Sequence, residues 1–216
     1  MPSLLRPQSN IFQISKDNIS EYLDSVVFIQ AENKNGEIKG YGTGFIVSLD
    51  GHIITCCHVV DNAEAIQIRL KIKEHIFWCS AKIVNMQRIC DLALLKIEGY
   101  NYPPLTLDSK NPDLGQKLIL LGYPFGKRLS DDIDKLNPSL FSGNVSSINS
   151  KNGYDRIYVN VEAKSGCSGA PVISEEDGKV VGILKGSIID QGKNLTEELN
   201  YIIPVKYIWQ HLVEHY

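Results

Sequence analysis

The sequence has 216 residues, of which 43% are hydrophobic, and a formal net charge of −3 at pH 7. This content is enough for one domain, or for two small and closely packed subdomains, with a sizeable core. The small negative charge, without a strong basic cluster, argues against a general binder of nucleic acid or of anionic membranes. We therefore expect neither nucleic acid nor membrane as a partner.

Residues 1–24 are expected to form an N-terminal extension with a short helix. Cap-like residues in the range 15–24 are followed by Ile19, Tyr22 and Leu23 at helical spacing. The first residues lack the extended apolar run of a signal peptide, and no later stretch is long enough to span a bilayer.

Residues 25–98 are predicted to form a first antiparallel β-barrel. Two turn signals, Asn35-Gly36 and Asp50-Gly51, separate apolar segments. Between residues 66 and 72 apolar and polar residues alternate, which predicts a strand that buries one face. The expected strands are 26–31, 45–49, 53–60, 66–72, 75–87 and 92–98.

A connector with Pro and Asn, residues 99–112, leads to a second β-rich half at residues 113–205. Turns are expected at Asn152-Gly153 and Asp177-Gly178. Apolar residues at helical spacing after residue 205 predict a C-terminal helix over 206–216. The expected strands of this half are 118–121, 144–148, 157–161, 172–174, 180–184 and 201–205.

Five cysteines, an odd number, indicate reduced thiols in a cytoplasmic protein. Cys56, Cys57, Cys90 and Cys167 each lie beside or near a candidate catalytic residue. Because the sequence holds no Cys-x-x-Cys pair, we expect no zinc site, and the proposed chemistry calls for no metal or cofactor.

Three residues in separate motifs could form a nucleophilic site. Ser168 stands in a Gly-x-Ser-Gly turn, His58 ends an apolar run, and Asp91 precedes another. A serine hydroxyl needs a base within hydrogen-bond reach and a group that orients the base. The order His, Asp, Ser is that of one known triad architecture and differs from the order in α/β-hydrolases.

Six motifs together carry a more specific signal. In their order and composition the sequence resembles HtrA-like serine proteases of the chymotrypsin fold, from about residue 26 to about residue 205. The resemblance implies an all-β chain of two antiparallel six-stranded barrels with short terminal helices. The six motifs are Gly42 to Val47, Thr55 to Val60, Asp91 to Lys96, Leu121 to Gly126, Ser142 to Ser146 and Gly166 to Gly169.

The resemblance implies a serine endopeptidase that acts on protein or peptide substrates through an acyl-enzyme. His58 would take the proton of Ser168 and return it to the leaving amine, while Asp91 fixes the imidazole tautomer. The turn over Gly166, Cys167 and Ser168 would form the oxyanion hole, with the N–H groups of Gly166 and Ser168 as donors.

Two positions leave alternatives open. Cys167 is a rival nucleophile, although the motif places Ser168 at the nucleophile position. Glu162 stands six residues before Ser168, where an acidic residue selects Lys or Arg in trypsin-like enzymes; the alternative is a solvent-facing glutamate, with Lys185 as a candidate neutralising partner. Glu162, Lys185 and Gly186 are therefore the candidate substrate-binding residues.

The sequence departs from the HtrA-like pattern at Ala170, where a second glycine is usual, and in showing no PDZ domain after the barrels. The charged segment 127–139 is expected to be a mobile surface loop near the active site, which a regulatory partner could order. A peptide-binding pseudoprotease and a serine esterase are the alternative functions.

Overall fold

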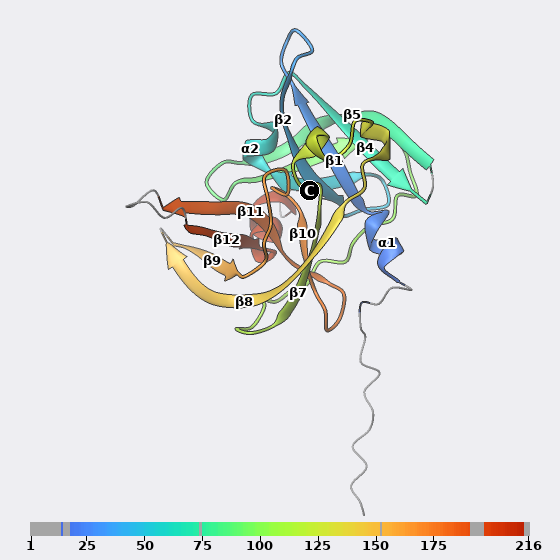
Figure 1. Ribbon diagram of the computed structural model, residues 1–216. Helices are drawn as coiled ribbons and strands as arrows, with labels where there is room; N and C mark the ends of the chain where they lie inside the picture. The colour runs from blue at the N-terminus through green and yellow to red at the C-terminus, as the bar shows by residue number, and fades with distance from the viewer. Residues whose placement is uncertain (1–13, 15–17, 74, 152, 191–196, 214–216) are drawn as a thin grey trace, which may run out of the picture.

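The computed structural model describes residues 14, 18–73, 75–151, 153–190 and 197–213. In these ranges the chain forms two closed six-stranded β-barrels packed together (Figure 1). The strand orders are β1-β2-β3-β6-β5-β4 and β10-β11-β12-β9-β8-β7, and all paired strands run antiparallel. The predicted all-β, two-barrel fold is therefore confirmed.

The first barrel closes where β1 pairs with β4, and its strands lie within the predicted range 25–98. Turns at Gly36 and Gly51 take positive φ values of 75° and 90°, which glycine adopts at low cost. The strands are β1 (Val26–Glu32), β2 (Ile38–Ile46), β3 (His52–Cys56), β4 (Ala65–Ile72), β5 (His75–Gln87) and β6 (Leu92–Ile97).

The third strand of this barrel ends four residues earlier than predicted, and this difference sets the position of His58. The prediction extended the third strand to Val60, but β3 ends at Cys56 and a single helical turn, α2 (Cys57–Val60), follows. The N–H of Asp61 donates to the carbonyl of Cys57 and closes the turn. Because Val59 and Val60 are buried, the turn leaves His58 exposed.

The second barrel closes where β7 pairs with β10. Strand β8 is much longer than the predicted 144–148 because its first half pairs with β7 and its second half with β9. Its Ser and Asn residues conceal this length from a hydrophobicity pattern. The strands are β7 (Lys117–Gly122), β8 (Ser139–Lys151), β9 (Tyr154–Val159), β10 (Pro171–Ser174), β11 (Val180–Asp190) and β12 (Glu197–Pro204).

Both predicted turns of this half fall where strands reverse. Gly153 and Gly178 have φ values of 80° and 71°, while Asn152 lies outside the described residues. The N-terminal helix is α1 (Ile19–Leu23), and part of its predicted range, 15–17, also lies outside them.

Near the C-terminus α3 (Lys206–Ile208) continues as a π-helical turn, Trp209–Val213, and residues 214–216 are not described. The N–H of Asp155 donates to the hydroxyl of Tyr207 at 2.7 Å, and the carboxylate of Asp155 pairs with Lys206. These contacts hold the helix against the start of β9.

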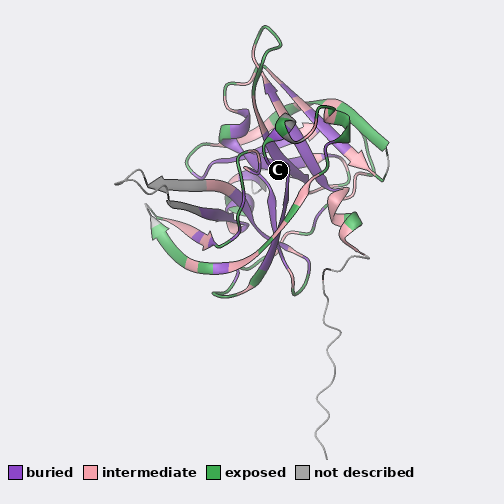
Figure 2. Ribbon diagram, in the orientation of Figure 1, coloured by how far each residue is buried: buried purple, intermediate pink, exposed green. Residues whose placement is uncertain are grey.

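Apolar side chains fill both barrels, and the buried residues concentrate on their strands (Figure 2). The larger cluster contains residues of both barrels and so continues across their junction. Two buried polar residues, Thr43 and Asp91, come from segments that reach the active site described below. Both residues contact the second barrel: Thr43 contacts Gly166, and Asp91 contacts Lys185.

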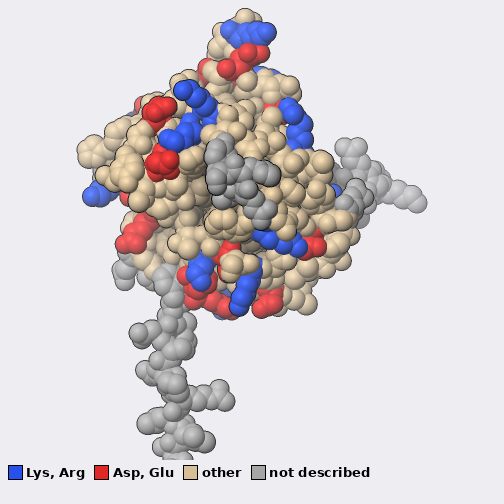
Figure 3. Space-filling view, turned by 180° about the vertical axis from the view of Figure 1, so that it is seen from behind, with Lys and Arg blue, Asp and Glu red and all other residues tan. Residues whose placement is uncertain are grey.

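On the face shown in Figure 3, Lys and Arg side chains are interspersed with Asp and Glu rather than gathered by sign. Across the described residues, no helix has the length and apolar character needed to cross a membrane.

Candidate active site

His58 and Asp91 form a doubly hydrogen-bonded pair. The Nδ1 atom of His58 lies 2.8 Å from Oδ2 of Asp91, and the backbone N–H of His58 donates to Oδ1 at 2.9 Å. The Asp91 side chain is 8% exposed and that of His58 is 48% exposed. The carboxylate therefore fixes the ring through Nδ1 and makes no contact with Nε2.

Asp91 reaches this position through a strained backbone. It ends the turn between β5 and β6 with a φ of 59°, a left-handed conformation that is uncommon outside glycine. Its carbonyl accepts from the N–H of Cys57 at 3.0 Å, which joins the turn to the start of α2. Main-chain and side-chain contacts therefore tie Asp91 to the helical turn that carries His58.

The charge on Asp91 is maintained by its partners. Burial raises the pKa of the Asp91 carboxyl, but the hydrogen bonds from His58 and the nearby Lys185 ammonium outweigh burial and hold the pKa below its usual value. Asp91 is therefore a carboxylate at neutral pH, as required of a group that orients a catalytic imidazole.

The turn that carries Ser168 depends on two glycines. Gly166 and Gly169 have φ values of 96° and 88°. A Cβ at Gly166 would lie 2.4 Å from the carbonyl oxygen of Tyr123, and one at Gly169 would lie 2.1 Å from that of Thr43. A larger residue at Gly169 would push the turn away from the first barrel, and one at Gly166 would push it away from the chain that follows β7.

Thr43 on β2 connects this turn to the first barrel. Its Oγ1 donates to the carbonyl of Gly166 at 2.8 Å and accepts from the N–H of Tyr123 at 3.0 Å. Its own N–H donates to the carbonyl of Ser168 at 2.9 Å. The sequence motif around Gly42 includes Thr43, but it gives no sign of this connecting role.

The two amides expected to form the oxyanion hole are free to donate. In the described part of the chain, the N–H groups of Gly166 and Ser168 take part in no hydrogen bond, whereas the intervening Cys167 donates to Lys164. This pattern fits a turn whose alternate N–H groups remain available for a substrate oxygen.

Ser168 and His58 line the same pocket of about 380 Å³. The hydroxyl of Ser168 donates to the carbonyl of Lys185 at 3.2 Å, and among the described contacts it makes no hydrogen bond to His58. The hydroxyl of Ser168 therefore points to the second barrel's own backbone in this structure. Catalytic hydrogen bonds are often long or absent before substrate binds.

Of the candidate substrate-binding residues, Lys185 and Gly186 line this pocket and Glu162 does not. Glu162 is exposed to solvent at the edge of the turn. The other lining residues are Ala163, Lys164, Ser165, Leu184, Asn200 and Tyr201.

The rival nucleophile Cys167 is fully buried in the second barrel's core. Burial raises the pKa of its thiol to about 11, so it is protonated at neutral pH. All five cysteines are free thiols.

Ligand atoms of Cys56, His58 and Asp91 lie within 4.8 Å of one another. Burial raises the pKa of the Cys56 thiol well above its usual value, and Lys185 pairs with Asp91 at 3.4 Å. Both features disfavour a divalent cation there.

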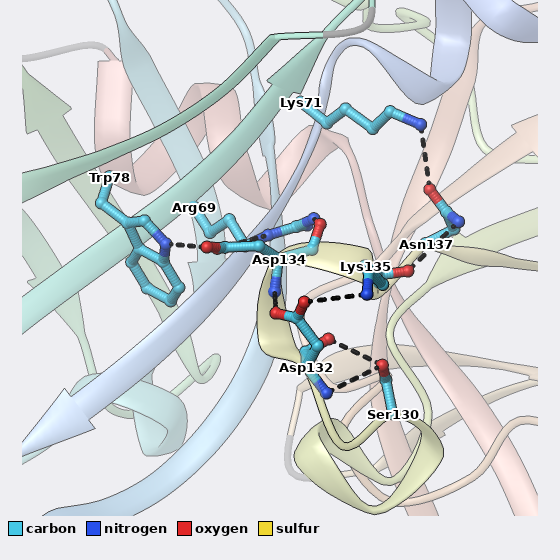
Figure 4. Close-up of polar contacts among 8 residues, drawn as sticks. All are labelled: Arg69, Lys71, Trp78, Ser130, Asp132, Asp134, Lys135 and Asn137. Atoms are coloured by element: carbon cyan, nitrogen blue, oxygen red, sulfur yellow. Dashed lines mark hydrogen bonds and ion pairs between the residues drawn. The ribbon is translucent and has the colours of Figure 1, made fainter.

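The segment between β7 and β8, predicted to be a mobile loop, is anchored to the first barrel (Figure 4). Arg69 on β4, fully buried although it lies on the face predicted to be polar and exposed, donates to the carbonyl of Asp134 at 2.5 Å. Trp78 donates to the Asp134 carboxylate at 2.9 Å. At the other end of the segment, the N–H of Phe125 donates to the carbonyl of Ser165 at 2.6 Å. The segment therefore also contacts the turn that carries Ser168, residues 165–169, which we call the nucleophile turn.

The sequence of residues 42–183 matches the family model of the trypsin-like peptidase domain. The chain belongs to the trypsin-like peptidase family.

A probable periplasmic serine endoprotease, DegP-like, of Halomonas elongata is 35% identical over 159 residues, which cover 71% of this chain and 31% of that protein. Protease Do-like 5, chloroplastic, of Arabidopsis thaliana is 27% identical over 217 residues, covering 91% of this chain and 65% of that protein. These relatives place the chain with the HtrA-like members.

The chain spans about a third of the length of the DegP-like relatives. Among solved structures, the serine endoprotease of Yersinia pestis has a TM-score of 0.72 at 22% identity, over 92% of this chain and 66% of that one. The active form of a protease from M. tuberculosis has a TM-score of 0.73 at 20% identity, over 97% and 93% of the two chains. At these identities the likeness shows the shared two-barrel fold.

Proposed function

We propose that this trypsin-like peptidase chain is a serine endopeptidase whose triad is His58, Asp91 and Ser168. One observation carries the proposal: the ring of His58 is bound at Nδ1 by a buried carboxylate and shares its pocket with Ser168. Family membership supports peptide bonds as the class of bond cleaved.

In the proposed reaction, the hydroxyl of Ser168 turns from the Lys185 carbonyl toward Nε2 of His58. His58 takes the proton as Oγ bonds to the peptide carbonyl carbon, and the N–H groups of Gly166 and Ser168 stabilise the oxyanion. The protonated imidazole then gives its proton to the leaving amine, and an ester on Ser168 remains. Water, activated by His58, hydrolyses this ester and restores the serine.

We further propose that the segment between β7 and β8, residues 123–138, which contains most of the predicted loop 127–139, regulates this activity. Asp134 of this segment contacts the buried Arg69, and Phe125 contacts the turn that carries Ser168. A protein partner that moved Asp134 would shift this segment, and with it the hydrogen bond from Phe125 to Ser165. The regulatory partner predicted from the sequence would act at this segment.

A cytoplasmic location stays a prediction based on the free thiols. The names of two relatives given above mention the periplasm and the chloroplast, respectively. Fractionation of the source cells with compartment markers would decide between a reducing and an oxidising compartment.

The proposal is tested by hydrolysis of a fluorogenic peptide library by wild type, Ser168→Ala, His58→Ala and Cys167→Ala. We expect the serine and histidine variants to lose about 10⁴- to 10⁶-fold in kcat, because members of a triad act as a unit. The Cys167→Ala variant should keep activity within about tenfold, since the thiol only fills core space. Equal activity of folded wild type and Ser168→Ala would refute the proposal.

A peptide-binding module is the second candidate, and the orientation of the Ser168 hydroxyl toward Lys185 favours it. In that case library peptides would bind to wild type and to Ser168→Ala with equal affinity, and neither protein would cleave them.

A further inference from the structure

Lys185 contacts two members of the proposed triad. Its backbone carbonyl accepts from Oγ of Ser168 at 3.2 Å, and its Nζ lies 3.4 Å from Oδ2 of Asp91. This Oδ2 is the same oxygen that lies 2.8 Å from Nδ1 of His58. A fixed positive charge therefore competes with the imidazole for one carboxylate oxygen.

The Lys185 ammonium is held in this place. Its Nζ lies 5.8 Å from the ring centroid of Tyr201, and the side chain is 34% exposed. Burial lowers the pKa of the ammonium, but Asp91 and Tyr201 outweigh burial and raise the pKa above its usual value. Lys185 is therefore charged over the whole pH range in which a histidine titrates.

Other titratable groups also lie around His58. Cys56 and Cys57 are buried thiols whose pKa values are raised by burial, so both are neutral at pH 7. Lys164 lines the same pocket from the nucleophile turn and is exposed to solvent. Beyond α2, Asp61 and Arg88 pair with each other at 2.7 Å.

We propose that Lys185 is an electrostatic positioning residue, whose ammonium weakens the hold of Asp91 on the protonated imidazole of His58. The inference rests on the proposed function, because it concerns the base of that triad. Removing the ammonium should therefore strengthen the ion pair between Asp91 and the protonated imidazole.

The main-chain and side-chain contacts of Lys185 can be separated by mutation. A Lys185→Met variant removes the ammonium, keeps a side chain of similar length, and retains the carbonyl that accepts from Ser168. Lys185→Arg keeps the positive charge and serves as the matched control, and Lys185→Gln is a second neutral variant in case the methionine protein does not fold.

The first readout is the NMR titration of His58 in protein labelled with ¹³C at histidine Cε1, with the resonance identified from a His58→Gln sample. The midpoint should rise by about one pH unit in Lys185→Met, as expected for loss of a partly solvated charge a few ångströms away. In Lys185→Arg it should stay within about 0.3 unit of wild type. The acidic midpoint of the kcat/KM profile should move by the same amounts.

An unchanged or lowered titration midpoint in folded Lys185→Met and Lys185→Gln would overturn the inference. The NMR titration needs no turnover, so it remains decisive if wild type cleaves no peptide; that result would refute the proposed function alone. A shift in both neutral variants and in Lys185→Arg would also overturn it, because the effect would then follow from side-chain shape rather than charge.

Discussion

Replacing Thr43 by valine should uncouple the nucleophile turn from the first barrel. Valine has nearly the same shape as threonine, so the substitution leaves no cavity, and the bonds of the Thr43 main chain are kept. It removes the hydroxyl that donates to the Gly166 carbonyl and accepts from the N–H of Tyr123. Because Tyr123 is fully buried, its N–H would lose its partner away from water.

The free energy of unfolding should fall by about 2–4 kcal/mol, of which an unpaired buried N–H accounts for about 1–3 kcal/mol and the lost hydrogen bond to the Gly166 carbonyl for about 1 kcal/mol. If loss of this hydrogen bond lets the turn shift so that the N–H of Gly166 no longer faces the substrate oxygen, one oxyanion donor is lost, and kcat should fall by about 10²-fold. The Michaelis constant should change little, since this donor acts mainly on the transition state.

Urea unfolding and steady-state hydrolysis of one peptide would measure these two effects. Thr43→Ser is the matched control because it keeps the hydroxyl and removes one buried methyl group, at about 1 kcal/mol. Its kcat should remain near that of wild type. A valine variant that lost stability but kept full kcat would show that Thr43 supports the fold without positioning the oxyanion turn.

Three further outcomes are expected. Asp91→Asn should lower kcat by about 10³- to 10⁴-fold near pH 7, because an amide no longer selects the tautomer of His58 that accepts a proton; measured activity within tenfold of wild type would contradict this. Asp134→Ala should lower the unfolding free energy by about 1–3 kcal/mol, since the buried Arg69, whose Nε lies 3.8 Å from Oδ1 of Asp134, loses this carboxylate. The exposed Asp131→Ala on the same segment should change it by less than about 0.5 kcal/mol in the same urea titration. In a substrate series with Lys, Arg, Leu or Val at the cleaved position, we expect the aliphatic residues to be cleaved faster because Glu162 lies outside a pocket lined by two lysines; faster cleavage after Lys or Arg would restore the hypothesis of a basic preference.

Alternating apolar and polar residues predicted a strand well where one face of the strand is turned to the barrel core. The alternation at 66–72 corresponds to β4, Ala65–Ile72, because each apolar residue there meets the core. The same pattern could not predict that Arg69 is buried. Its cover comes from Asp134, which is 65 residues away in sequence.

The order of the motifs was enough to select His58, Asp91 and Ser168 as candidates. The structure brings His58 and Asp91 into contact and places Ser168 in the pocket that His58 lines. The order of the motifs was not enough to predict the short turn α2, because four residues with two valines look like a continued strand. Nor could it predict the ammonium of Lys185 beside Asp91. That contact depends on the packing of β11 against the first barrel, for which a single sequence gives no local signal.

Labelling with a fluorophosphonate probe, followed by mass spectrometry of the modified peptide, tests the assembled site most directly. The probe reacts with a serine only when a base and an oxyanion hole activate it. We predict one adduct per chain, on Ser168, which is absent in Ser168→Ala and retained in Cys167→Ala. A folded protein that gives no adduct, or an adduct on another residue, would contradict the assignment of Ser168 as the nucleophile.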